Sequence, residues 1–284
     1  MSAISGILIF ASFIISIYSY FYNTSILIFA GIFAWYAFFI LFSSLYNKKL
    51  VLVLCILSFI TLLVSFYNEY KIDLIKLFTV NQFLLTLLIG VGFLRLISTP
   101  KKENMKNLPI GKSSFIKTYI GVHLFGSVIN MSSLLLVADK LYKKAKLTNS
   151  QIIVLTRAFS SDAYWSPFFV AFAAALTYAP NLDTHLILFN GLLLAFIGFL
   201  ITYIEITKNK DLDLENFKGY PISLDNLVLP FSLAFLVLLT NYFYEDIKVI
   251  VLIALFSILL TFIVLPIKKG FKNSCEIFKI HILE

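Results

Sequence analysis

Residues 26–45 read ILIFAGIFAWYAFFILFSSL, twenty consecutive positions without a charged side chain. As a helix, about 20 such residues span the ~30 Å hydrocarbon core of a bilayer. A strand of a membrane barrel would instead alternate apolar and polar positions over about ten residues. Neither this stretch nor residues 249–265 alternates in that way, so both predict transmembrane helices.

Similar segments recur along the whole chain. Of the 284 residues, 60% are hydrophobic and 13% are charged, against roughly 25% charged residues in a soluble domain. This composition argues against a soluble enzyme. It predicts one all-α integral membrane domain over residues 1–284, a polytopic bundle with about eight or nine spans. Four spans fall in residues 1–98, a candidate site region in 115–179 and three spans in 186–267. The nine apolar blocks are residues 3–20, 26–46, 50–67, 78–97, 115–138, 151–179, 186–206, 227–243 and 249–267.

The net charge of +8 comes from lysines that lie mostly in the links between these blocks. Short cytoplasmic links of membrane proteins carry an excess of Lys and Arg, so the lysines indicate orientation in the bilayer and not nucleic-acid binding. If all nine blocks cross, the lysines of the links and the C-terminal tail divide 13 to 7 between the two faces. If block 115–138 enters and leaves by one face, they divide 17 to 3. We therefore expect eight crossings, one re-entrant hairpin over residues 115–138, and both termini in the cytoplasm.

The middle of block 115–138 has the composition of a turn, GSVINMSS from residue 126 to residue 133. Non-helical backbone at membrane depth is tolerated where it is buried in protein or lines a cavity. Gly126 permits the turn, and four polar side chains beside it can bond freed backbone groups or a ligand. These are Ser127, Asn130, Ser132 and Ser133. The alternative is one straight helix whose small residues face a neighbouring helix.

Block 151–179 is longer than one span requires and contains RAFSSDAYWSP, residues 157–167. Pro167 has no N–H to donate and crowds the preceding turn, which predicts a broken helix. Charged residues near mid-membrane are costly unless they are paired or face water, so Arg157 and Asp162 are candidates for a functional site. The polar residues beside them are Ser160, Ser161 and Ser166. The alternative places residues 151–162 on the membrane surface and starts the span at residue 163.

No motif for a metal or a cofactor is present, and we expect neither. The three histidines form no HExxH motif, and Cys55 and Cys275 have no metal-ligand spacing. His123 is the one histidine inside an apolar block. It could act as a general base in acyl transfer, although a hydrogen bond to a neighbouring helix is the simpler role.

The order of four spans, a hairpin with a Ser/Asn-rich tip and a broken span resembles one repeat of the ion-transporter superfamily of secondary carriers. The resemblance covers roughly residues 1–206. The stretch 157–169 is also similar to one found in uncharacterised permease-like proteins of bacterial inner membranes. The resemblance implies that Asn130, Ser132 and Ser133 line a substrate or sodium site. The whole expected binding set is Ser127, Asn130, Ser132, Ser133, Arg157, Ser160, Ser161, Asp162 and Ser166.

The expected function is therefore secondary transport of a small solute across a bacterial inner membrane with H⁺ or Na⁺ coupling. The solute would be anionic if Arg157 binds it. The chain departs from the superfamily because no second, inverted repeat follows block 151–179. A homodimer or a partner membrane subunit could supply one. Two alternatives stay open: a membrane-embedded transferase for a lipid-linked substrate, with His123 as base, and a non-catalytic subunit of a membrane complex.

Overall fold

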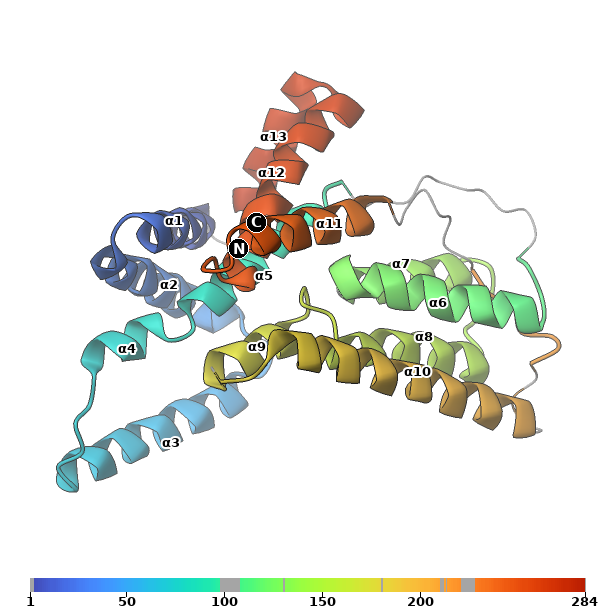
Figure 1. Cartoon of the computed structure of the whole chain (residues 1–284), viewed down its shortest axis with the longest axis horizontal. Coiled ribbons are helices and arrows are strands. Elements are labelled where there is room, and N and C mark those ends of the chain that lie inside the picture. The colour runs from blue at the N-terminus through green and yellow to red at the C-terminus, as the bar shows by residue number, and fades with distance from the viewer. Residues whose placement is uncertain are drawn as a thin grey trace. The chain divides into compact units, whose positions relative to one another are not determined.

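The computed structural model describes residues 3–97, 108–129, 131–179, 181–209, 212, 214–220 and 228–283. Most of these residues are helical (Figure 1), which confirms the all-α class. In this part of the chain the one β-type contact is an isolated bridge between Ile110 and Lys218. Asn130, a predicted site residue, lies outside the described residues, and so does the side chain of Ser132.

The chain divides into two compact units, residues 1–89 with 266–284, and residues 90–265. In the first unit, α13 packs against α1 so closely that a Cβ on Gly6 would lie 2.0 Å from the carbonyl oxygen of Ile282. Glycine is therefore required at this contact. The helices of this unit are α1 (Ala3–Phe21), η1 (Thr24–Ile26), α2 (Leu27–Leu41), η2 (Phe42–Ser44), α3 (Lys48–Tyr67), α4 (Leu74–Thr79), most of α5 (Gln82–Leu94), the end of α12 (Val249–Lys269) and α13 (Phe271–Leu283).

The second unit has a hydrophobic core to which α6, α7, α8 and α10 contribute. Phe115 and Tyr119 of α6 pack there with Leu141 of α7, Leu155 of α8 and Ile206 of α10. The unit contains the remainders of α5 and α12. Its own helices are α6 (Lys112–Ile129), α7 (Met131–Tyr142), α8 (Asn149–Ser160), η3 (Ser161–Tyr164), α9 (Val170–Tyr178), α10 (Thr184–Lys208) and α11 (Val228–Phe243).

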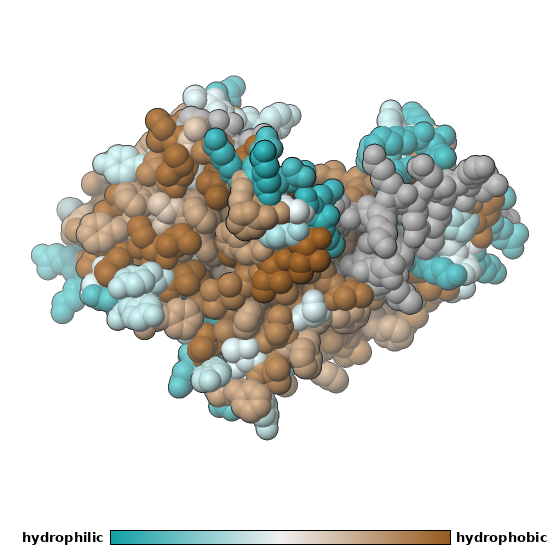
Figure 2. Space-filling view, turned by 90° about the horizontal axis from the view of Figure 1, so that it is seen from above, coloured by the Kyte–Doolittle hydropathy of each residue, from teal (hydrophilic) through white to brown (hydrophobic). Residues whose placement is uncertain are grey.

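In the part of the chain that the structure describes, six helical segments are long and apolar enough to cross a membrane. Hydrophobic side chains cover much of the surface seen in Figure 2. The eight or nine spans predicted from the sequence are not confirmed. Blocks 115–138 and 151–179 are each divided between shorter helices, and α11 is a shorter apolar helix. The six segments are residues 3–21, 24–44, 48–67, 74–94, 184–208 and 249–269.

Helices α6 and α7 lie side by side in opposite directions (Figure 1). A Cβ on Gly126 would lie only 2.9 Å from Oγ of Ser133, although seven residues of a straight helix span about 10 Å. Phe115, near the start of α6, and Leu141, near the end of α7, share one core cluster. The re-entrant position predicted for this pair is not confirmed, because helix length and composition do not reveal the membrane face at which each end lies.

The polypeptide leaves helical geometry between α8 and α9. Thr148 caps the start of α8: its hydroxyl accepts from the backbone N–H of Gln151, and the Gln151 side chain accepts from the N–H of Thr148. Helix α8 ends at Ser160, η3 follows, and α9 begins only at Val170. Pro167, which cannot donate a helical hydrogen bond, lies in the interruption. This interruption brings a set of polar side chains next to α6.

Candidate functional site

One face of α6 supplies the first half of the candidate site. Tyr119, His123 and Ser127 are spaced by four residues, so they lie on the same side of the helix. The second half comes from the interruption after α8, where Ser161, Asp162, Trp165 and Ser166 follow each other within six positions. The site therefore forms where α6 meets η3 and the residues that directly follow it.

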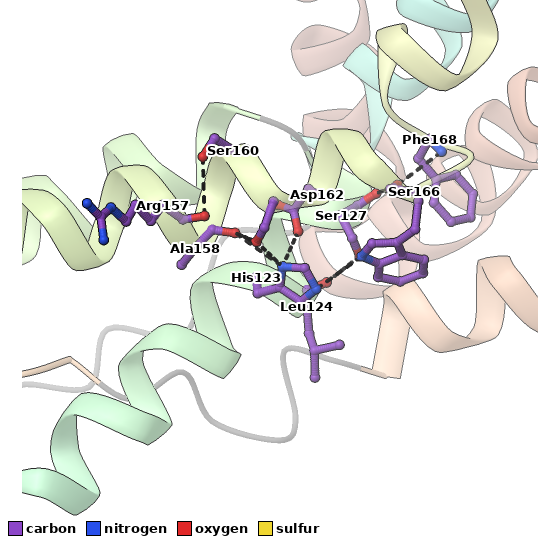
Figure 3. Close-up of polar contacts among 11 residues, drawn as sticks. His123, Leu124, Ser127, Arg157, Ala158, Ser160, Asp162, Ser166 and Phe168 are labelled. Carbon is purple, nitrogen blue, oxygen red and sulfur yellow. Dashed lines mark hydrogen bonds and ion pairs between the residues drawn. The ribbon is translucent and has the colours of Figure 1, made fainter. Parts of the chain in front are cut away.

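Asp162 and His123 form the centre of this cluster (Figure 3). Oδ1 of Asp162 lies 2.8 Å from Nδ1 of His123, and the two side chains are 0% and 14% exposed. Nδ1 is also 2.9 Å from Oγ of Ser161 and 3.2 Å from the carbonyl oxygen of Ala158. Because the Ser161 hydroxyl donates to that same carbonyl at 2.9 Å, it accepts from the histidine. Nδ1 of His123 is therefore close to three oxygen atoms, one each from Asp162, Ser161 and Ala158.

Trp165 determines which nitrogen of His123 carries the proton. Its indole Nε1–H donates to Nε2 of His123 at 3.0 Å, and an indole can only donate. Nε2 must therefore present a lone pair, and the proton of the neutral ring lies on Nδ1. An imidazolium would carry a hydrogen on both nitrogens and would break this bond. The Trp165 contact therefore favours the tautomer whose proton lies on Nδ1, the nitrogen that is 2.8 Å from Oδ1 of Asp162.

The carboxyl group of Asp162 has unused hydrogen-bonding capacity. Among the described residues, neither of its buried oxygens accepts a well-aligned hydrogen bond. The 2.8 Å contact with Nδ1 is close, but the aligned partners of that N–H are Ala158 and Ser161. A buried carboxylate without donors is strongly unfavourable, so the site is arranged for a proton or another cationic group.

Gly126 allows the carboxyl group to approach α6. A Cβ at this position would lie 2.2 Å from Oδ2 of Asp162 and 2.9 Å from Oγ of Ser133. Only glycine leaves room for this approach. Oδ2 and the Ser133 hydroxyl thus come close to one point on α6, although they belong to η3 and α7.

Two further predicted site residues tie the interruption to α6. The Ser166 hydroxyl donates a short hydrogen bond to the backbone oxygen of Ser127 and accepts from the N–H of Phe168 at 3.2 Å (Figure 3). The Ser127 hydroxyl donates to the carbonyl of Leu124 at 2.9 Å. Both side chains are buried, and their hydroxyls bond backbone oxygens, so they position the segment that carries Asp162.

Arg157 and Ser160 lie apart from this centre. Arg157 points away from Asp162 (Figure 3) and pairs with Glu205 of α10, Nη1 to Oε2, at 2.6 Å. Both side chains of this pair are about two-fifths exposed, at 39% and 41%. The exposed Ser160 hydroxyl donates to the Arg157 carbonyl at 3.3 Å. The guanidinium is therefore occupied by a carboxylate and does not face Asp162.

The structure brings together Ser127, Ser133, Ser161, Asp162 and Ser166 from the predicted set. The sequence did not predict the contribution of Trp165 or the pairing of Arg157 with Glu205. The four-residue spacing of Tyr119, His123 and Ser127 is the signal from which the polar face of α6 could have been found.

No group of three or more His, Cys, Asp or Glu side chains with metal-binding geometry occurs among the residues that the structure describes. Comparisons with protein families, with curated proteins and with solved structures gave no match.

Proposed function

We propose that this protein is a secondary transporter in which Asp162 binds the coupling proton. The observation that carries the proposal is a fully buried carboxyl group whose oxygens lack aligned donors among the described residues. It lies at a helix interruption in a chain whose described residues include six candidate membrane spans. In membrane carriers, interrupted helices present unpaired backbone groups inside the bilayer. Substrates and coupling ions bind at these interruptions.

A proton fits this site better than Na⁺. The nearest group to Oδ1 is a ring nitrogen at 2.8 Å, and Oδ2 faces Gly126 with the Ser133 hydroxyl as the neighbouring oxygen. Na⁺ sites of carriers are built from several oxygens, including unwound backbone carbonyls, and the Ser127 carbonyl already accepts from Ser166. Protonation removes the buried charge without any new ligand.

The transferase alternative requires His123 to take a proton from a substrate. Its Nε2 already accepts from Trp165, and its Nδ1 contacts Ala158, Ser161 and Asp162. No ring nitrogen is left to face a substrate. This engagement favours a positioning role for His123 over catalysis.

In the proposed transporter, α6 and α7 form a re-entrant hairpin, and both termini lie in the cytoplasm of a bacterial inner membrane. Single cysteines in a Cys55→Ser/Cys275→Ser background test this topology. We expect cysteines at Lys112 and Asn149 to react with an impermeant reagent only from the cytoplasmic face, and one at Asn181 only from outside. If the cysteines at positions 112 and 149 react from opposite faces, the chain crosses the membrane between them. The re-entrant hairpin would then be contradicted.

Proton coupling is tested in proteoliposomes that contain a trapped pH indicator. Small organic anions and small neutral solutes are supplied outside, and we expect at least one to drive proton movement. Asp162→Asn should abolish this movement. Asp139→Asn is the matched control, because that carboxylate is 54% exposed and pairs with Lys143, four residues further along the chain. Solute-driven proton movement that survives Asp162→Asn would contradict the proposal.

A further inference from the structure

The first unit contains a second candidate site, which lies between α2, α4 and α5. This cavity, here named the amide pocket, has a volume of about 390 Å³, within the range of small-molecule sites. Its walls are apolar, and Asn81 and Gln82 contribute the amide groups. Among the described residues, no charged side chain lines it. The lining residues are Gly31, Ala34, Trp35, Phe38, Leu77, Phe78, Asn81, Gln82, Leu84, Leu85 and Leu88.

Hydrogen bonds to α1 fix the orientation of the Gln82 amide. The Ser12 hydroxyl donates its hydrogen to the carbonyl of Ala30 at 2.8 Å, and the Ser16 hydroxyl donates to the carbonyl of Ser12 at 2.7 Å. Each hydroxyl has one hydrogen, so towards Gln82 both can only accept. The amide nitrogen must therefore face them, and it donates at 2.5 Å and 3.0 Å.

This orientation leaves the carbonyl oxygen as the part of the Gln82 amide that bonds neither Ser12 nor Ser16. Both hydrogens of its NH₂ are used by Ser12 and Ser16, and Gln82 lines the cavity. An amide oxygen only accepts hydrogen bonds. The pocket thus combines apolar walls with a fixed hydrogen-bond acceptor. It favours a ligand that carries a hydrogen-bond donor.

The walls are held in place by a close contact between α2 and α4. A Cβ on Gly31 would lie 2.2 Å from the carbonyl oxygen of Phe78, so the two backbones touch at this point. Ala37, six positions further along α2, is also buried. The cavity is therefore formed without a ligand, as in most small-molecule sites.

We propose that the amide pocket binds a neutral amphiphile with one alkyl chain and a hydroxyl head group, whose O–H donates to Gln82. The described lining offers no charged partner, which a buried charged head group would need, and so it favours an uncharged one. The apolar walls take the alkyl chain. This site is independent of Asp162 and of the proposed proton coupling.

Trp35 lines the pocket and serves as the reporter. The chain has two tryptophans, so Trp165→Phe leaves Trp35 as the single indole. The probes are ω-bromododecanol and bromododecane, whose bromine quenches indole fluorescence, added to the protein in lipid nanodiscs. We expect saturable quenching, with the alcohol binding about fivefold more tightly than the alkane, as one net hydrogen bond supplies.

Two variants separate the pocket from its acceptor. Ala34→Leu fills the cavity and should weaken quenching by both probes at least tenfold, whereas Ala171→Leu, at an exposed position of α9, should leave it unchanged. Gln82→Leu should abolish the preference for the alcohol. Equal affinity for the two probes in the parent protein, or unchanged binding in Ala34→Leu, would overturn the proposal.

Discussion

Gly126→Ala tests whether Asp162 is held against α6. The new methyl group would lie 2.2 Å from Oδ2 of Asp162, whereas ordinary contacts begin near 3.4 Å, so the carboxyl group must move by about 1 Å or more. Asp162 is fully buried, so this movement disturbs its 2.8 Å contact with Nδ1 of His123. Overpacking costs about 1–3 kcal/mol, and displacing a buried polar group from its neighbours adds about 1–3 kcal/mol.

Alanine also gains about 0.5–1 kcal/mol over glycine inside a helix, which offsets part of this cost. We expect Gly126→Ala to lower the free energy of unfolding by about 2–4 kcal/mol, a fall in Tm on the order of 10 °C. Thermal unfolding in detergent, followed by intrinsic fluorescence, measures it. Gly198→Ala in α10 is the control, because its Cβ would lie 3.9 Å from the nearest atom, in the Tyr164 ring.

A double-mutant cycle assigns the effect to the carboxyl group. In an Asp162→Ala background the opposing oxygen is absent, so adding Gly126→Ala should cost little. Two results would refute the reasoning: a Gly126→Ala protein as stable as the Gly198→Ala protein, or a Gly126→Ala cost that is the same with and without Asp162.

Three further substitutions test other contacts of the second unit. Ser161→Ala leaves Nδ1 of His123 with one acceptor fewer and should cost about 1–2 kcal/mol, whereas Ser160→Ala, at an exposed hydroxyl, should stay within about 0.5 kcal/mol; equal melting temperatures would contradict the assignment. Glu205→Gln breaks the 2.6 Å ion pair with Arg157, whose two side chains are 39% and 41% exposed, and should lower the free energy of unfolding by no more than about 1 kcal/mol; a much larger fall in melting temperature would contradict this weak contribution. Gly191→Ala places a Cβ 2.1 Å from the Tyr164 carbonyl oxygen and should lower the free energy of unfolding by about 1–3 kcal/mol. A rise in stability, as expected for a helical glycine without such a contact, would show that the two backbones separate easily.

The sequence predicted the helices better where the apolar run is long and uninterrupted. Residues 50–67 lie within α3 and residues 249–267 within α12, because a run of about 20 apolar residues is a local signal that any helix in a bilayer must satisfy. The interruption after Ser160 contains Pro167. Its cause is equally local, because proline cannot donate a helical hydrogen bond. The division of residues 74–94 between α4 and α5 was not predicted, because no proline or glycine precedes it.

Partners across helices could not be predicted from one sequence. Arg157 was considered together with Asp162, five residues away, but its partner is Glu205 on α10. Asp162 instead contacts His123 on α6. Charge and depth identified both residues as candidates, but the choice of partner depends on how α6, α8 and α10 pack. The role of Trp165 could not be predicted for the same reason. Its indole donates to Nε2 of His123 at 3.0 Å, and this contact also depends on how the helices pack.

Helix α3 has no buried residue in the first unit, so its tilt is set by the bilayer and not by protein neighbours. Its 20 residues span about 30 Å as a helix, close to the average thickness of the hydrocarbon core. Lys48 and Lys49 begin the helix and Tyr67 ends it, and such residues anchor helix ends at the two interfaces. In a thinner bilayer α3 should therefore tilt without straining the remaining helices, and its orientation would report lipid thickness.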